Sequence, residues 1–162
     1  MENLNVKNVV LVHGAFADGS GFKALYNELT KKGYNVSVVQ NPLTSLEDDV
    51  LATHVALDRI GGPAILAGHS WGGAVITEAG NHPNVVALVY IAAFQPDNGE
   101  SALIATEDKS INPDIQRTMY SRSNTQVIEV KGSHVIFMSQ PKIVAGVIIE
   151  AAEKASAMAS VM

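Results

Sequence analysis

Residues 68–73 read GHSWGG, in which Ser70 stands two positions from a glycine on either side. An apolar run of strand length precedes this G-x-S-x-G pattern and a helix-like stretch follows it, which is the context in which such a serine acts as a nucleophile. A sharp strand-to-helix turn exposes the serine hydroxyl at the start of a helix. We therefore expect Ser70 to be a nucleophile, with the Trp71 N–H stabilising an oxyanion.

A second glycine-containing loop, residues 13–16 (HGAF), follows the first apolar run. In a doubly wound sheet the first and third strands flank the point where strand order reverses, so this loop and the Ser70 turn should meet. The Ala15 N–H is the predicted second oxyanion donor. Residues 19–24 fit the dinucleotide pattern G-x-G-x-x-A, but they start well after the strand and no acid follows at the ribose position, so no cofactor is expected.

Ser70 needs a base that titrates near neutrality, and histidine meets this requirement. His134 is the predicted base, because it follows the last strand-like run in residues 131–134 (KGSH), from which a side chain can reach the same crevice. The other four histidines lie in the two turns, within a helix-like stretch or before a proline: His13, His69, His54 and His82.

Two aspartates could orient the imidazole of His134. Asp108 follows the fifth strand-like run in residues 105–109 (ATEDK), and Asp97 follows the fourth in residues 95–97 (QPD). Both give the chain order serine, aspartate, histidine. The order alone leaves the choice open.

Apolar runs of strand length alternate with helix-like stretches, which is typical of a parallel sheet covered on both faces. Thr44 with Glu47 forms a capping-box candidate, and Gly33 and Gly61 stand where left-handed helix caps are needed. We predict an α/β fold with a doubly wound, mostly parallel six-stranded sheet. Its expected strands are residues 9–12, 36–40, 64–67, 85–91, 103–105 and 126–130, and its expected helices are 22–32, 46–60, 73–81, 113–121 and 141–157.

Composition restricts the class of protein. The 162 residues, 47% of them hydrophobic, suit a single domain over residues 1–162. A net charge of −5 without basic clusters disfavours nucleic acid and membrane surfaces as partners. The absence of cysteine excludes disulfides and thiolate metal sites and suits a cytoplasmic location, and neither a signal peptide nor a membrane-spanning run is evident.

Together, residues 68–73, 13–16, 105–109 and 131–134 resemble the α/β-hydrolase superfamily, most closely small bacterial esterase-like hydrolases related to plant methyl esterases and hydroxynitrile lyases. The resemblance covers almost the whole chain. It implies Ser70 as nucleophile, His134 as base and Asp108 rather than Asp97 as acid, with Ala15 and Trp71 as the oxyanion hole. Related lyases carry a threonine and a lysine at the positions of Gly14 and Val135, so cyanohydrin cleavage is not expected.

The chain departs from this family where the helical cap is normally inserted, because only residues 95–101 are present there. The first two strands of the full superfamily sheet are also missing. The expected function is therefore a serine esterase that cleaves small carboxylic esters weakly and broadly, with a high KM and little dependence on acyl length. The alternative is a catalytically lapsed fold or a small-molecule binding module.

The short connection also bears on assembly. Parallel neighbours normally need roughly 10 to 12 connecting residues, whereas seven extended residues reach only about 23 to 25 Å. The chain is expected to be either a monomer with a tight crossover or a domain-swapped homodimer. In the dimer, residues 101–162 would dock on the partner chain, so that Ser70 and the Asp108–His134 pair would come from different chains.

Overall fold

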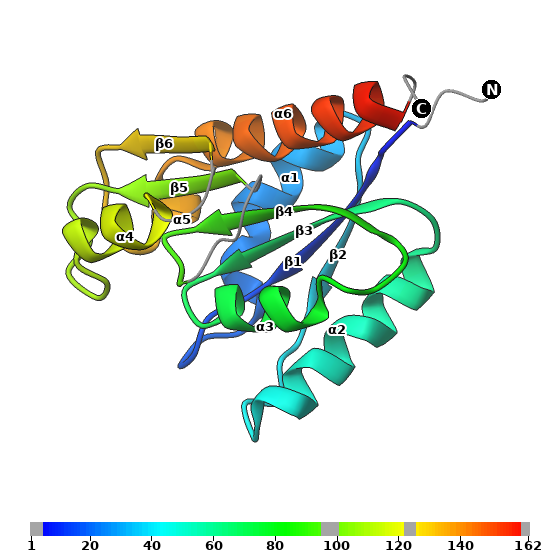
Figure 1. Ribbon diagram of the computed structural model, residues 1–162, viewed down its shortest axis with the longest axis horizontal. Helices are drawn as coiled ribbons and strands as arrows, with labels where there is room; N and C mark the ends of the chain where they lie inside the picture. Colours follow the sequence, from blue (N-terminus) through cyan, green and yellow to red (C-terminus); the bar gives the residue numbers. More distant parts are fainter. Residues whose placement is uncertain (1–4, 95–100, 122–125, 160–162) are drawn as a thin grey trace.

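The computed structural model describes residues 5–94, 101–121 and 126–159. Within them, six parallel strands form one sheet in the order β2-β1-β3-β4-β5-β6 (Figure 1). The strand order reverses between β1 and β3, as the doubly wound prediction requires. The strands are β1 (Asn8–Val12), β2 (Asn35–Val39), β3 (Ala64–His69), β4 (Val85–Ile91), β5 (Ser101–Ala105) and β6 (Gln126–Val130).

Helices cover both faces of the sheet, which confirms the predicted α/β class (Figure 1). One face carries the 3₁₀ turn η1 (Gly19–Phe22), α1 (Lys23–Lys31), α5 (Ile136–Ser139) and α6 (Pro141–Ala159). The other face carries α2 (Leu46–Ile60), α3 (Gly72–Ala79) and α4 (Pro113–Tyr120).

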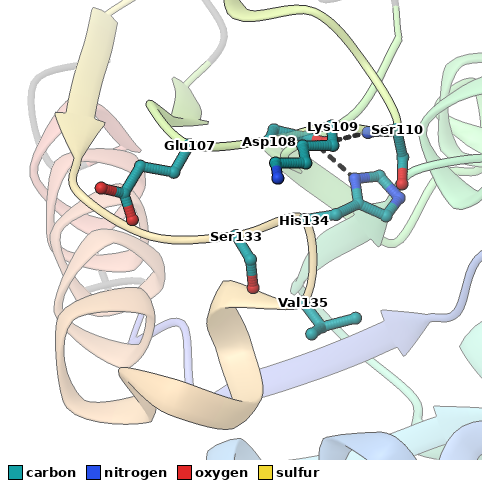
Figure 2. A pocket seen from close by; sticks show the side chains of 7 residues that line it. All are labelled: Glu107, Asp108, Lys109, Ser110, Ser133, His134 and Val135. Atoms are coloured by element: carbon teal, nitrogen blue, oxygen red, sulfur yellow. Dashed lines mark hydrogen bonds and ion pairs between the residues drawn. The ribbon is translucent and has the colours of Figure 1, made fainter.

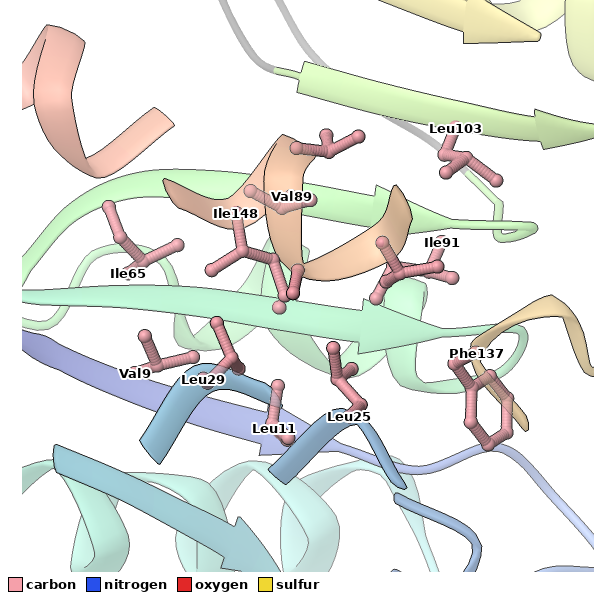
Figure 3. Packing of buried hydrophobic residues seen from close by; sticks show 14 of the residues in the cluster. Val9, Leu11, Leu25, Leu29, Ile65, Val89, Ile91, Leu103, Phe137 and Ile148 are labelled. Atoms are coloured by element: carbon pink, nitrogen blue, oxygen red, sulfur yellow. The ribbon is translucent and has the colours of Figure 1, made fainter. Parts of the chain in front are cut away.

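The core explains why these runs become strands. Along β1, Val9 and Leu11 join the cluster under α1 and α6, while Val10 and Val12 join the cluster under α2 and α3. Figure 3 shows the first cluster, where α1 and α6 side chains pack on the sheet. Because alternate residues point to opposite faces and both are covered, a central strand must be apolar throughout.

Both predicted glycine caps follow helices in the structure, and α4 begins with an asparagine cap. Gly33 and Gly61 have φ of 79° and 67°, a region that glycine enters without a Cβ clash, and Asn112 caps α4 by accepting the Asp114 N–H. The capping-box prediction for α2 is wrong by one residue. The cap is Ser45, whose Oγ accepts the Asp48 N–H, and the Thr44 hydroxyl bonds the Asp48 side chain instead.

β5 pairs in parallel with β4 within one chain, with Val89 opposite Ser101 and Ile91 opposite Leu103. The predicted connection, apart from Ser101, lies outside the described residues. Seven peptide units join Phe94 to Ser101 and reach about 23 to 25 Å when extended.

We propose that the protein is a monomer with its complete site in one chain. When Ser70→Ala and His134→Ala chains are unfolded, mixed and refolded together, we expect the mixture to stay as inactive as each variant alone. Parent protein carried through the same cycle should recover its activity and elute as a monomer. Restored activity in the mixture would instead establish exchange of residues 101–162 between chains.

Candidate active site

The turn between β3 and α3 holds Ser70 in a backbone conformation that side-chain-bearing residues rarely adopt. Its φ is 53°, in the left-handed region, and such strain persists only where the surroundings impose it. They impose it here through close backbone approach. A Cβ added to Gly68 would lie 2.4 Å from the Gly72 carbonyl oxygen, and one added to Gly72 would lie 2.4 Å from the Val12 oxygen. Only glycine fits these two positions.

The loop after β1 lies directly against this turn, as expected for two loops that flank the point where strand order reverses. A Cβ added to Gly14 would stand 3.0 Å from the Ser70 Cβ. Neither the Ala15 N–H nor the Trp71 N–H has an acceptor among the described residues. Two free donors on either side of the serine are what an oxyanion hole requires.

His13 fixes this loop. Its Nδ1–H donates to the Gly14 carbonyl oxygen at 2.8 Å, and its Nε2 accepts the Asn41 N–H at 2.9 Å. Because one ring nitrogen donates and the other accepts, the imidazole is the neutral Nδ1–H tautomer. His13 therefore has a structural role, tying the β1 loop to the end of β2.

His134 and Asp108 form the hydrogen-bonded pair that the family resemblance implies. The His134 Nδ1 lies 2.8 Å from the Asp108 Oδ2, and the Asp108 carboxylate is fully buried. The pair lines an open hollow of about 980 Å³, together with other residues of the two strand-end loops. Figure 2 shows these side chains and the bond between His134 and Asp108. Asp97, the rival acid, lies outside the described residues.

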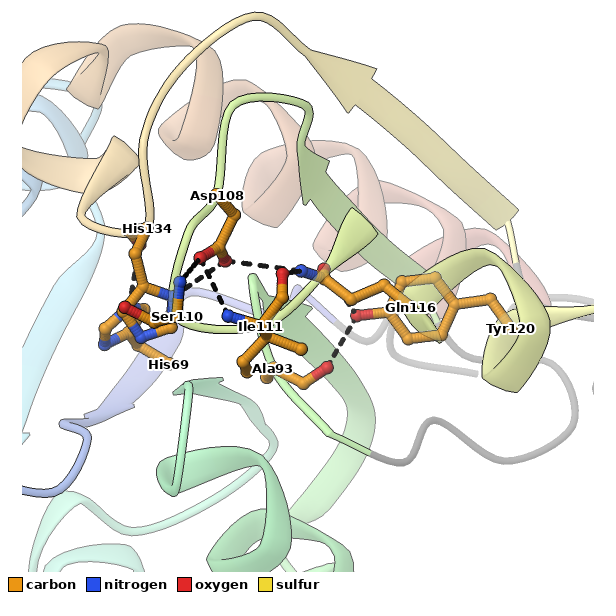
Figure 4. A network of polar contacts seen from close by, with 8 residues as sticks. All are labelled: His69, Ala93, Asp108, Ser110, Ile111, Gln116, Tyr120 and His134. Atoms are coloured by element: carbon orange, nitrogen blue, oxygen red, sulfur yellow. Dashed lines mark hydrogen bonds and ion pairs between the residues drawn. The ribbon is translucent and has the colours of Figure 1, made fainter. Parts of the chain in front are cut away.

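A network anchored in α4 holds the carboxylate (Figure 4). The Asp108 Oδ1 accepts the Ser110 and Ile111 N–H groups at 2.7 and 2.9 Å. The Gln116 Nε2 donates to Oδ2 at 3.3 Å and to the Ile111 carbonyl oxygen at 2.9 Å. These bonds place the Asp108 carboxylate between His134 and α4.

The second layer of this network is Tyr120, whose hydroxyl donates to the Ala93 carbonyl oxygen at 2.7 Å. Burial raises the pKa of this phenol above its ordinary value, so it stays a donor. Neither Gln116 nor Tyr120 was predicted from the sequence. The sequence feature that could have identified them is their i, i+4 spacing. It places the polar Gln116 on the buried face of α4 together with Tyr120.

His69, the residue before Ser70, contacts His134. Its Nε2 donates to the His134 carbonyl oxygen at 2.9 Å, and the two rings are 4.5 Å apart. Burial, with the neighbouring His134 as the next cause, lowers the pKa of His69 to about 4. His69 is therefore uncharged at neutral pH and adds no positive charge beside the imidazole of His134.

The structure brings the predicted site residues together at the carboxyl ends of the strands. One contact that the predicted triad needs is not formed. Among the described residues, Ser70 Oγ and His134 Nε2 make no hydrogen bond. Contacts of this kind are often long before substrate binds. Ala15 and Trp71 line a second hollow, a cleft of about 550 Å³ between the β1 loop and the start of α2.

The described residues contain no group of three or more histidine or acidic side chains placed to hold a metal ion. None of their helices is long and apolar enough to cross a membrane.

The chain is similar to known hydrolases. A model of the alpha/beta hydrolase family matches residues 9–104. A carbendazim hydrolyzing esterase from Nocardioides sp. (strain SG-4G) is 36% identical over 123 residues, which cover 67% of this chain and 50% of that protein. The chain thus spans about half the length of this curated relative.

Solved structures share the fold at low identity. A pyrethroid hydrolase from Sphingobium faniae JZ-2 superposes with a TM-score of 0.78 at 19% identity, over 91% of this chain and 98% of that one. Polyneuridine aldehyde esterase gives a TM-score of 0.81 at 16% identity, over 90% and 98%. With the family match over residues 9–104 and the serine turn in its strand-to-helix setting, these findings show that the chain belongs to the α/β-hydrolase family.

Proposed function

We propose that the protein is a serine hydrolase that cleaves small carboxylic esters through an acyl-enzyme intermediate. The observation that carries this proposal is the buried Asp108–His134 pair beside the strained Ser70 turn. The relatives support the ester as substrate, because one is named an esterase that hydrolyses carbendazim and another a pyrethroid hydrolase.

In the proposed reaction, His134 Nε2 takes the Ser70 proton while Oγ attacks the ester carbonyl. Asp108 keeps the hydrogen of the imidazole on Nδ1, which leaves Nε2 free to accept. The Ala15 and Trp71 N–H groups receive the oxyanion, and His134 then protonates the leaving alcohol. Water repeats the sequence to release the acid.

We propose weak overall activity and broad selectivity for the alcohol. The hollow that contains His134 is open and lined in part by charged side chains, Glu107 and Lys109 among them. An open site buries little of a ligand, so remote binding energy is scarce and KM is high.

A fluorophosphonate probe tests the proposal, because it reacts only with a serine whose base and oxyanion donors are aligned. We expect one label per chain, on Ser70 by peptide mapping, together with hydrolysis of p-nitrophenyl acetate. Heat-denatured protein is the control and should stay unlabelled. A folded protein that neither takes the label nor cleaves the ester would favour the lapsed fold or binding module.

A further inference from the structure

We propose that the cleft between the β1 loop and the start of α2 binds the acyl group of the ester and selects uncharged, apolar acyl chains. This inference rests on the proposed ester hydrolysis and names its substrate class. The apolar walls of the cleft are Phe16, Leu43, Leu46 and Trp71. At about 550 Å³ the cleft has the size of an ordinary small-molecule site.

The positions of the donors and the base assign the two halves of the ester. Ala15 and Trp71, which carry the free N–H groups, line the cleft, so a carbonyl oxygen bound to them sits at its mouth. His134 lines the other hollow. Because His134 must protonate the leaving alcohol, the alcohol lies on its side and the acyl chain extends into the cleft.

Backbone strain independently marks the cleft as a site. Phe16 and Leu43 are large residues, and each has a φ of 59°, in the left-handed region. Both side chains are also exposed, Phe16 completely and Leu43 by 42%. Strained backbone that presents apolar surface to water gains nothing for the folded core, whereas strain of this kind clusters at ligand-binding positions.

Asp49 holds two of the walls together. Its Oδ1 accepts the Leu43 N–H at 2.8 Å, and its Oδ2 accepts the Trp71 indole N–H at 2.9 Å. The residue is fully buried, so both carboxylate oxygens are occupied by the walls themselves. A ligand therefore meets the apolar walls, with only Thr44 and Ser45 as uncharged polar lining residues, and the carboxylate behind them disfavours an anionic chain end. Asp49 was not predicted from the sequence.

This cleft changes one expectation from the sequence, that activity would depend little on acyl length. We expect kcat/KM for p-nitrophenyl hexanoate to exceed that for the acetate by roughly tenfold, because a longer chain buries more apolar surface. Thr44→Phe, at an exposed lining position, should bring this ratio close to one. Val135→Phe, the same residue placed in the other hollow, should leave the ratio as in the parent.

A binding measurement separates this inference from the proposed function. Trp71 is the only tryptophan of the chain and lies in the cleft, so its fluorescence reports on occupation. In a Ser70→Ala background, we expect hexanamide to change this emission saturably at a roughly tenfold lower concentration than acetamide, for the same reason of buried apolar surface. Adding Thr44→Phe should weaken the hexanamide response.

Each outcome decides one of the two proposals. Hydrolysis of acetate with a flat acyl series, or equal ratios in the two phenylalanine variants, would overturn the acyl cleft and leave the esterase standing. No hydrolysis of any ester would overturn the esterase. In that case a saturable preference for hexanamide would still support an apolar binding cleft, and its absence would overturn it.

Discussion

Ser70→Ala is expected to reduce hydrolysis of p-nitrophenyl acetate to the uncatalysed background, a larger loss than any other single change to the site. The hydroxyl is the atom that forms the acyl-enzyme, and nothing else at the turn can replace it. Stability should not change, because alanine keeps the Cβ against which Gly14 packs and meets the same left-handed backbone. Thermal unfolding by circular dichroism checks this second expectation.

Ser139→Ala is the matched control. Ser139 lies in α5, and its hydroxyl makes only a 3.4 Å contact with the Ile136 carbonyl oxygen. This variant should keep the activity of the parent and take the fluorophosphonate label at Ser70. A Ser70→Ala protein as active as its parent would place the chemistry on another residue.

The sequence predicts those parts of the molecule that local pattern determines. The bounds of α2, β4 and β6 agree with the predicted ranges. For α2 the local signals are Ser45 and Gly61 at its two ends, and for β4 an uninterrupted apolar run that begins after Asn84. The five-residue β5 is two residues longer than predicted, and the four-residue α5 was not predicted, since one helical turn has no periodicity of its own.

Contacts between distant segments could not be derived in the same way. Asp49 and Trp71 are 22 residues apart, and their hydrogen bond exists only because α2 and α3 pack on the same face of the sheet. The contacts of Gln116 with Asp108 and of Tyr120 with Ala93 likewise depend on the angle at which α4 docks. Asp108 itself was chosen over Asp97 by family resemblance, since both residues follow strands whose ends meet at one edge.

Asp108→Asn is expected to lower kcat/KM by a factor on the order of 10⁴, as in the serine protease template, with little change in KM. The reason lies in the hydrogen bonds. The amide oxygen of the substituted side chain can still accept the Ser110 and Ile111 N–H groups, which turns its NH₂ group toward His134 Nδ1. Nδ1 must then be unprotonated to accept, so the hydrogen moves to Nε2, and the imidazole can no longer take the proton of Ser70.

Two aspartate controls make this result specific. Asp97→Asn, at the rival position, and Asp114→Asn, whose side chain is 84% exposed, should each change kcat/KM less than about threefold. The tautomer has its own readout, because ¹⁵N shifts of His134 should report hydrogen on Nδ1 in the parent and on Nε2 in Asp108→Asn. If Asp97→Asn caused the large loss instead, the orienting acid would follow β4, and the Asp108–His134 bond would serve only to hold the loop after β6 against α4.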